Sequence, residues 1–184
     1  MKIIVGMSGA TGAIFGIRIL EELKKLGVET HLVVSPWAEK TILLETGLKV
    51  EEVKKLANVV HSYYNQAASI SSGSYITDGM IIAPCSMKTL ASISCGLSDN
   101  LLSRAADVIL KEKRKLVIVP RETPLHEIHL ENMLKLARMG AVILPPMPAF
   151  YIKPNTLEDM IDHTVARILD QFDIHTDLSK RWME

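Results

Sequence analysis

Small and hydroxyl-bearing residues fill a short stretch near the start of the chain, Gly6 to Ala13, which reads Gly-Met-Ser-Gly-Ala-Thr-Gly-Ala. Without bulky side chains, the backbone N–H groups of Gly9, Ala10 and Thr11 can approach an anion, and a helix start adds partial positive charge. The glycine spacing matches neither the dinucleotide fingerprint nor a Walker loop. A tight turn with close helix–sheet packing explains the same residues, so this loop alone leaves both interpretations open.

A second loop of this kind follows an apolar run and reads Pro84-Cys85-Ser86-Met87-Lys88-Thr89. Its hydroxyls and the N–H groups of a helix start form another potential anion site. Ser86 is equally explained as a plain N-cap, and Cys85 as a small packed apolar residue. Ser35 precedes Pro36, which is the pattern of an N-cap before proline at the first helical position.

A charged pair, Arg121 and Glu122, stands between Pro120 and Pro124. Arginine suits bidentate recognition of phosphate, and a glutamic acid beside phosphate can donate a proton if its pKa is raised. A surface ion pair is the plainer explanation. Further along, three prolines stiffen the loop before Tyr151, whose ring and hydroxyl suit the wall of an apolar pocket with one polar contact.

Two cations in a helical stretch, Arg104 and Lys111, are seven residues apart and therefore share one helix face. The charge run that starts at Lys111 is usual for a solvated helix end. His126 and His129 have metal-ligand spacing, but no third ligand is evident, so we expect no metal site.

The elements that must position these residues alternate between short apolar runs and helix-period segments. Runs rich in Val and Ile, with little polar alternation, are typical of strands buried on both faces of a parallel sheet. We expect strands at Ile3–Gly6, Thr30–Val34, Val59–His61, Met80–Ala83, Leu116–Val119 and Val142–Leu144. We expect helices over Ala13–Leu26, from Ser35, over Leu125–Met139 and from Thr156 to about Phe172.

This alternation predicts a doubly wound α/β fold, with helices on both faces of a parallel six-stranded sheet, in a single domain over residues 1–184. Such sheets bind ligands beyond the carboxyl ends of their strands, where all the loops described above fall.

Composition narrows the functional classes. The chain has 184 residues, and Lys+Arg and Asp+Glu both total 21, so no basic surface for nucleic acid or an anionic membrane is indicated. Two cysteines without CxxC spacing indicate a reduced, cytoplasmic protein. The apolar start breaks at Gly6 and is not expected to be a signal peptide, and no apolar run reaches transmembrane length.

Taken together, these loops resemble the flavin prenyltransferases, the UbiX-like family. The resemblance runs along nearly the whole chain and rests on segments in order and at the right spacing. These are VGMSGATGA, HLVVSPWA, LLETG, SISSGSYITDGMIIAPCSMKTL, RAADVILKE, LVIVPRETPLHEIHLENMLKLARMGAVILPPMPAFY and TVARILDQF.

The resemblance implies a Rossmann-like flavoprotein that assembles as a homododecamer with active sites at subunit junctions. It implies that FMN is held by Gly9, Ala10, Thr11, Ser35, Ser86, Met87, Lys88, Thr89 and Arg121, with Arg104 near the site. It implies that dimethylallyl phosphate is held by Lys111, Arg121, Tyr151 and Arg167, with Glu45 and Glu122 at the reacting centre. Many relatives have serine at the position of Thr11, which keeps the hydroxyl and adds a methyl group.

The implied reaction transfers a dimethylallyl group to N5 and C6 of reduced FMN, without a metal, and supplies prenylated FMN to a UbiD-type aromatic acid decarboxylase. Lys111, Arg121 and Arg167 would stabilise the departing phosphate, and Glu122 would protonate it. Three alternatives stay open: a flavin-dependent peptidyl-cysteine decarboxylase of the same superfamily, a non-catalytic FMN-binding accessory subunit, and a chain that itself decarboxylates aromatic acids. The first normally has a PASANT-like segment at Pro84–Thr89.

Overall fold

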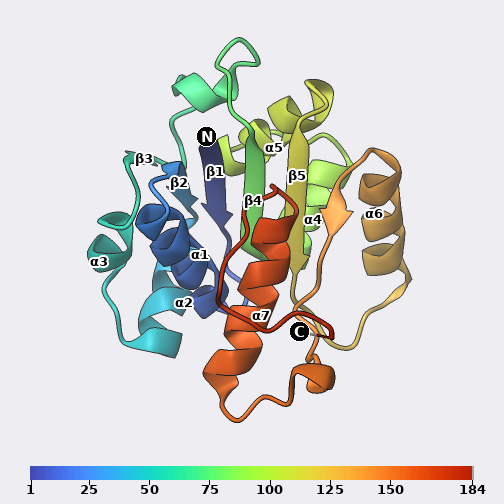
Figure 1. Ribbon diagram of the computed structural model, residues 1–184. Coiled ribbons are helices and arrows are strands. Elements are labelled where there is room, and N and C mark those ends of the chain that lie inside the picture. Colours follow the sequence, from blue (N-terminus) through green and yellow to red (C-terminus); the bar gives the residue numbers. More distant parts are fainter. Residues whose placement is uncertain (184) are drawn as a thin grey trace.

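A computed structural model describes residues 1–183 and contains one six-stranded sheet in which every neighbouring pair of strands is parallel (Figure 1). The strand order is β3-β2-β1-β4-β5-β6. The strands are β1 (Lys2–Met7), β2 (Glu29–Val34), β3 (Val59–His61), β4 (Gly79–Cys85), β5 (Lys115–Pro120) and β6 (Val142–Ile143). All six expected strands are confirmed to within two residues at each end.

Helices alternate with the strands, as the doubly wound pattern requires. They are α1 (Ala13–Lys25), α2 (Pro36–Thr46), α3 (Val50–Lys54), α4 (Met87–Ser94), α5 (Leu101–Lys111), α6 (Glu127–Arg138) and α7 (Leu157–Asp170). Two 3₁₀ turns, η1 (Ser69–Ser71) and η2 (Phe150–Ile152), lie in connections. The expected helix from Leu125 begins two residues later, and the short helix α3 was not anticipated.

Helix starts follow the capping residues in the sequence. Ser35 accepts a hydrogen bond from the Ala38 amide, with Pro36 at the first helical position. Thr156 and Asp159 form a capping box at the start of α7. Gly140 has φ +97°, which glycine adopts without strain, and it ends the turn after α6.

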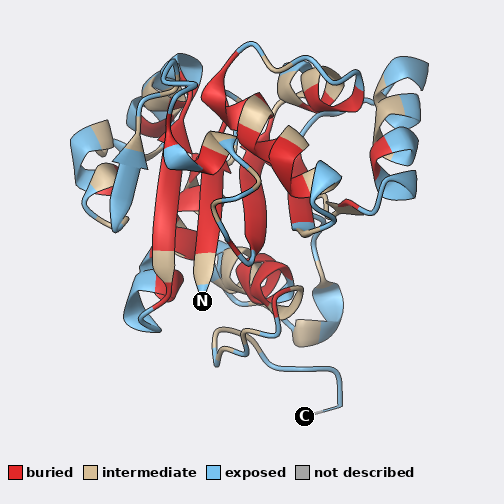
Figure 2. Cartoon of the chain, turned by 90° about the horizontal axis from the view of Figure 1, so that it is seen from above, coloured by how far each residue is buried: buried red, intermediate tan, exposed pale blue. Residues whose placement is uncertain are grey.

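The core lies on both faces of the sheet, which gives three layers. Alternate residues of β1, such as Ile3 and Val5, pack against α1 and α7 on one face, whereas Ile4 packs with α4 and α5 on the other. Figure 2 shows the buried residues concentrated in the strands and in the inner sides of the helices. The expectation of strands buried on both faces is wrong for β3, because it is an edge strand with Val59 and Val60 exposed.

The loops at the two ends of the strands form two separate surfaces: the carboxyl edge, where the strands end, and the amino edge, where they begin. Because all strands are parallel, their carboxyl ends meet at one edge, toward the bottom of Figure 1, and their starts meet at the other. Among residues 1–183, no helix combines the length and apolar character needed to cross a membrane.

Candidate functional site

Three helices begin side by side at the carboxyl edge. Strands β2, β1 and β4 are neighbours in the sheet, and α2, α1 and α4 start directly after them. The first N–H groups of a helix have no partner within the helix and carry partial positive charge, so this edge attracts anions. The expected carboxyl-edge location of the loops that carry chemistry is confirmed.

The start of α1 already has an anionic partner from within the chain. The Glu45 carboxylate accepts hydrogen bonds from the backbone N–H groups of Gly12 and Ala13, at 2.9 and 3.0 Å. Glu45 comes from the last turn of α2, so the contact joins the two helices. A Cβ atom at Gly9 would clash with Trp37 of α2, which is why this loop position requires glycine. The close packing of the loop is therefore observed, and binding of a ligand anion by Gly9, Ala10 and Thr11 stays a prediction.

The start of α4 is tied to the first loop by a buried serine. Ser8 Oγ donates to the Pro84 carbonyl at 3.1 Å and accepts from the Ser86 amide at 2.7 Å. Ser86 Oγ in turn accepts from the Thr89 amide at 3.3 Å, so Ser86 is the N-cap of α4. The cap leaves room for an anion, because the other amides of the first turn of α4 still have no partner within the helix, and Lys88 in that turn is exposed.

Arg121 and Glu122 follow β5, the neighbour of β4. The Arg121 amide donates to the Cys85 carbonyl at 3.2 Å, which holds the two loops together. Both side chains are exposed, and the Glu122 carboxylate accepts from the Thr123 amide at 3.0 Å. The arginine and the start of α4 are therefore adjacent at this edge, and the acid is the next residue along the chain.

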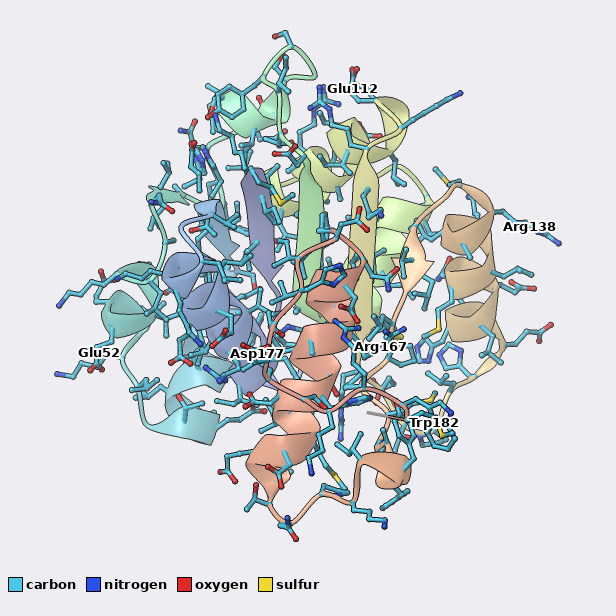
Figure 3. All side chains as sticks on the ribbon, viewed as in Figure 1. Glu52, Glu112, Arg138, Arg167, Asp177 and Trp182 are labelled. Carbon is cyan, nitrogen blue, oxygen red and sulfur yellow. The ribbon has the colours of Figure 1, made fainter. Side chains whose placement is uncertain are left out.

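A cavity of about 310 Å³ lies between η2, α7 and the C-terminal segment. Tyr151 and Arg167 both line it, so the structure brings together two residues far apart in sequence. Lys180 and Arg181 add two more cations, and the one acid in the lining is Asp170, which accepts from Arg167 at 2.8 Å. Figure 3 shows Arg167 and Trp182 at the same end of the molecule. The surplus of positive charge suits an anionic ligand such as a phosphate ester.

A buried histidine forms the wall of this cavity. His163 is 7% exposed, and its Nε2 lies 3.2 Å from the Tyr151 hydroxyl. Its Nδ1 lies 3.0 Å from Ser179 Oγ. Burial, together with the nearby Arg167 cation, lowers the pKa of His163 below its ordinary value. Tyr151 also meets Trp182 edge-on, with ring centroids 5.2 Å apart.

The remaining histidines and cysteines do not add a second reactive centre in the described part of the chain. His126 and His129 stack with centroids 3.5 Å apart, and residues 1–183 contain no cluster of three or more His, Cys, Asp or Glu side chains that could hold a metal ion. Complete burial raises the pKa of the Cys85 thiol well above its usual range, which confirms that Cys85 is a packed residue.

Comparison with known proteins identifies the family. The family model described as Flavoprotein matches residues 1–176. A probable UbiX-like flavin prenyltransferase of Bacillus subtilis (strain 168) is 64% identical over 182 residues, covering 99% of this chain and 89% of the relative. This chain belongs to the UbiX-like flavin prenyltransferase family.

Solved structures of flavin prenyltransferase relatives share the fold. A dodecameric FMN-dependent UbiX-like decarboxylase from Escherichia coli O157:H7 gives a TM-score of 0.98 at 57% identity, covering 100% of both chains. AnUbiX in complex with FMN and dimethylallyl pyrophosphate gives a TM-score of 0.98 at 57% identity, covering 100% of this chain and 97% of that one. The expected family and its Rossmann-like fold are confirmed.

Two cations that the flavin prenyltransferase resemblance placed at the site lie elsewhere in the protomer. Lys111 ends α5 just before β5 begins, so it lies at the amino edge, where it pairs with Glu112. Figure 3 shows Glu112 at the end of the molecule opposite Arg167. Arg104 donates to the Ser71 carbonyl at 3.2 Å and pairs with Asp107. One chain therefore does not bring Lys111 and Arg104 to Tyr151 and Arg167.

Sequence reasoning did not single out several residues that shape these loops and the cavity. Ser8 looked like loop filler, although its buried hydroxyl joins two loops. The cavity residues His163, Asp170, Ser179, Lys180, Arg181 and Trp182 were also missed. One signal was available: His163 and Arg167 are four residues apart and share a face of α7.

Proposed function

We propose that this protein transfers the dimethylallyl group of dimethylallyl phosphate to N5 and C6 of reduced FMN, and so makes prenylated FMN for a UbiD-type aromatic acid decarboxylase. The observation that carries the proposal is the cationic cavity in which Tyr151 and Arg167 meet. Its volume, about 310 Å³, suits a small ligand, and its charge suits a phosphate. A relative of this family is known in complex with FMN and dimethylallyl pyrophosphate.

The carboxyl edge fits the phosphate group of FMN. We assign that phosphate to the start of α4, between Ser86, Met87, Lys88 and Thr89, with Arg121 from the next loop. Gly9, Ala10, Thr11 and Ser35 line the neighbouring helix starts and complete the binding site. Reduced FMN, when bound, supplies the nucleophilic ring nitrogen and carbon that accept the prenyl group.

The donor phosphate belongs in the cavity, next to Arg167 and the tyrosine hydroxyl. Charge grows on the phosphate as its bond to carbon breaks, and Arg121 and Arg167 stabilise that charge without rearrangement. Glu122 donates a proton to the leaving phosphate, and Glu45 holds the loop that adjoins the flavin. The rings of Tyr151 and Trp182 line the cavity and limit the access of water to the allylic cation.

Lys111 and Arg104 act on the site of a neighbouring protomer in this proposal. They lie too far from Tyr151 in their own chain, and the relative from Escherichia coli O157:H7 is dodecameric. A homododecamer with sites at subunit junctions would let these cations complete a neighbour's site. Every chain would act as one domain, and two free cysteines agree with a reducing, cytoplasmic location.

The alternatives lack support from specific residues. A carrier of FMN has no need of the Tyr151–Arg167 cavity, and the Pro84–Thr89 segment does not match the PASANT-like pattern of cysteine decarboxylases. A chain that itself decarboxylates aromatic acids would need a dipolar flavin, which unmodified FMN does not provide.

The test is mass spectrometry of the flavin after anaerobic incubation of the protein with reduced FMN and dimethylallyl phosphate. The expected product is FMN heavier by one five-carbon prenyl unit, and none forms without protein. Unmodified FMN bound to folded protein, both with the monophosphate and after a repeat with the diphosphate, would support the carrier instead. An aromatic acid assay without any partner tests the third alternative.

A further inference from the structure

The buried His163 lies behind Tyr151 rather than in the open cavity. It is 7% exposed, whereas Tyr151 is 49% exposed. The imidazole joins two segments, because it contacts the Tyr151 hydroxyl of η2 on one side and Ser179 of the C-terminal segment on the other. A ligand in the cavity would touch Tyr151, and His163 can act on that ligand only through the tyrosine.

The donors and acceptors in the hydrogen-bond series from Tyr151 through His163 to Ser179 can be assigned from the Lys180 carbonyl. The Lys180 carbonyl can only accept, so the Ser179 hydroxyl, 3.3 Å away, donates its single proton to it. Ser179 Oγ must then accept from His163 Nδ1, which places a proton on Nδ1. A neutral imidazole with a proton on Nδ1 has a bare Nε2, so it accepts the proton of the Tyr151 hydroxyl.

The charges around His163 keep it neutral near pH 7. Burial is the first cause of its lowered pKa, the Arg167 cation is the second, and Asp170 opposes them. The charged or titratable groups that line the same cavity are Tyr151 from η2, Arg167 and Asp170 from α7, and Lys180 and Arg181 from the C-terminal segment. Cations outnumber anions among them, which disfavours a further positive charge on the ring.

We infer that His163 is a positioning residue that sets the hydrogen-bonding role of Tyr151 toward the phosphate of the prenyl donor. Neutral His163 accepts a hydrogen bond from the Tyr151 hydroxyl, so the tyrosine ring is held and its oxygen, with no proton to spare, offers no hydrogen bond to the phosphate. Protonated His163 donates from Nε2 instead, which frees the Tyr151 proton for the phosphate. The inference rests on the proposed function, because it assigns the phosphate to this cavity.

A pH dependence of donor binding follows. Since the pKa of His163 lies below 6.5, its ordinary value, the tyrosine becomes a donor only in the acidic range. The phosphate ester has its own second pKa near 6, and its loss of charge opposes tight binding in that range. A ratio of two protein variants at each pH cancels this ligand effect, because both variants bind the same ester.

The experiment compares the wild-type protein with His163→Gln and His163→Phe by measuring kcat and KM for dimethylallyl phosphate. Glutamine keeps a hydrogen bond to Tyr151 but does not titrate, whereas phenylalanine keeps the ring and loses both bonds. We expect His163→Phe to lower KM about threefold at about pH 8 with little change in kcat, because the Tyr151 proton is then free for the phosphate. We expect KM of His163→Gln near the wild-type value at about pH 8, and a growing excess over wild type toward about pH 5.

Three results would overturn the inference: an unchanged KM in folded His163→Phe, a KM of His163→Gln well above wild type at about pH 8, or a His163→Gln to wild-type ratio that stays flat with pH. If His163→Phe does not fold, Ser179→Ala takes its place. This change removes the acceptor that fixes the imidazole tautomer, so Nε2 can carry the proton and release that of Tyr151, and we expect KM to fall about twofold. An unchanged KM in Ser179→Ala would then count against the inference.

The controls separate this inference from the proposed function. Tyr75→Phe disturbs a second histidine–tyrosine pair far from the cavity and should leave KM unchanged. If wild-type protein makes no prenylated FMN, the proposed function fails. If it does and the variants match wild type at every pH, only the role of His163 fails.

Discussion

The molecule contains two histidine–tyrosine pairs with equal distances, one at each end of the sheet, whose interplanar angles are 66° and 86°. At the amino edge, His31 Nε2 lies 3.2 Å from the Tyr75 hydroxyl, with ring centroids 5.5 Å apart. At the carboxyl edge, His163 Nε2 lies 3.2 Å from the Tyr151 hydroxyl, also with centroids 5.5 Å apart. The pairs differ in what surrounds the tyrosine, and that difference separates a structural cluster from a functional one.

At the amino edge, the cluster is closed on itself. Lys2 Nζ donates to Tyr75 at 2.9 Å and pairs with Glu29 at 3.4 Å, and Glu29 contacts His31 at 3.0 Å. His61 completes the set, because its Nε2 lies 2.9 Å from His31 Nδ1. At the carboxyl edge, Tyr151 instead borders a cavity with Arg167. The same side-chain pair is therefore surrounded by polar neighbours in one place and borders a cavity in the other.

The largest expected difference is in kcat, between a substitution of Glu122 at the carboxyl edge and one of Glu29 at the amino edge. Glu122→Gln should leave FMN binding intact and lower kcat for prenyl transfer about 100-fold, because the amide cannot protonate the leaving phosphate. Glu29→Gln should leave kcat unchanged and lower the melting temperature, because Glu29 pairs with Lys2 and His31. Flavin fluorescence titration and single-turnover mass spectrometry measure the two steps. If FMN affinity collapses in Glu122→Gln while bound FMN reacts normally, the role of Glu122 is wrong.

A smaller effect is expected for the arginine at the carboxyl edge. Arg121→Ala should weaken both FMN and dimethylallyl phosphate, each about tenfold, since its guanidinium is expected between the two phosphates. Calorimetric titration with each ligand measures this, and Arg138→Ala is the matched control, because Arg138 is an exposed residue at the C-terminal end of α6. An unchanged affinity for dimethylallyl phosphate would contradict the placement of Arg121.

The two tyrosines give a direct test of the comparison. Tyr151→Phe should raise KM for the donor about fivefold at about pH 5, where protonated His163 leaves the hydroxyl proton free for the phosphate. Tyr75→Phe should cost about 1 kcal/mol of unfolding free energy and leave KM unchanged, because its hydroxyl serves only neighbouring side chains. Urea unfolding and steady-state kinetics separate the outcomes. Equal effects of both changes on KM would break the distinction between the edges.

The sequence predicted local features better than the joining of distant segments. Strands and helix caps depend on nearby residues, so Ser35, Ser86 and Thr156 identified helix starts correctly. The cavity depends instead on where the C-terminal segment returns along α7, and no local pattern encodes that path. His163 and Trp182 were therefore missed, although Tyr151 and Arg167 were expected.

The positions of two cations, Arg104 and Lys111, also depended on the chain path and not on a local pattern. The seven-residue spacing places Arg104 and Lys111 on one face of α5. The fold topology decides at which end of the sheet these two side chains lie. Helix α5 runs back toward the start of β5, so Lys111 lies at the amino edge. A resemblance to a family identifies the residues of a site but not the protomer that supplies each one. The path of this chain places Lys111 and Arg104 away from Tyr151 and Arg167.

The smallest effect concerns His61 in the amino-edge cluster, and it is a loss of unfolding free energy at low pH. Burial, and secondarily His31, lowers the pKa of His61 below 6.5, so the unfolded chain binds this proton more readily than the folded one. The resulting stability is present above pH 6.5 and is lost as the pH falls below that value toward the folded-state pKa. His61→Gln keeps a donor to His31 but does not titrate, so its unfolding free energy should fall less between about pH 7 and pH 5 than that of wild type, by at most about 1.4 kcal/mol per pH unit. Urea unfolding at each pH, with the exposed His126→Gln as control, measures this difference. Parallel curves for wild type and His61→Gln would mean that His61 does not resist protonation, and that the amino edge is less tightly packed around it than its hydrogen bonds indicate.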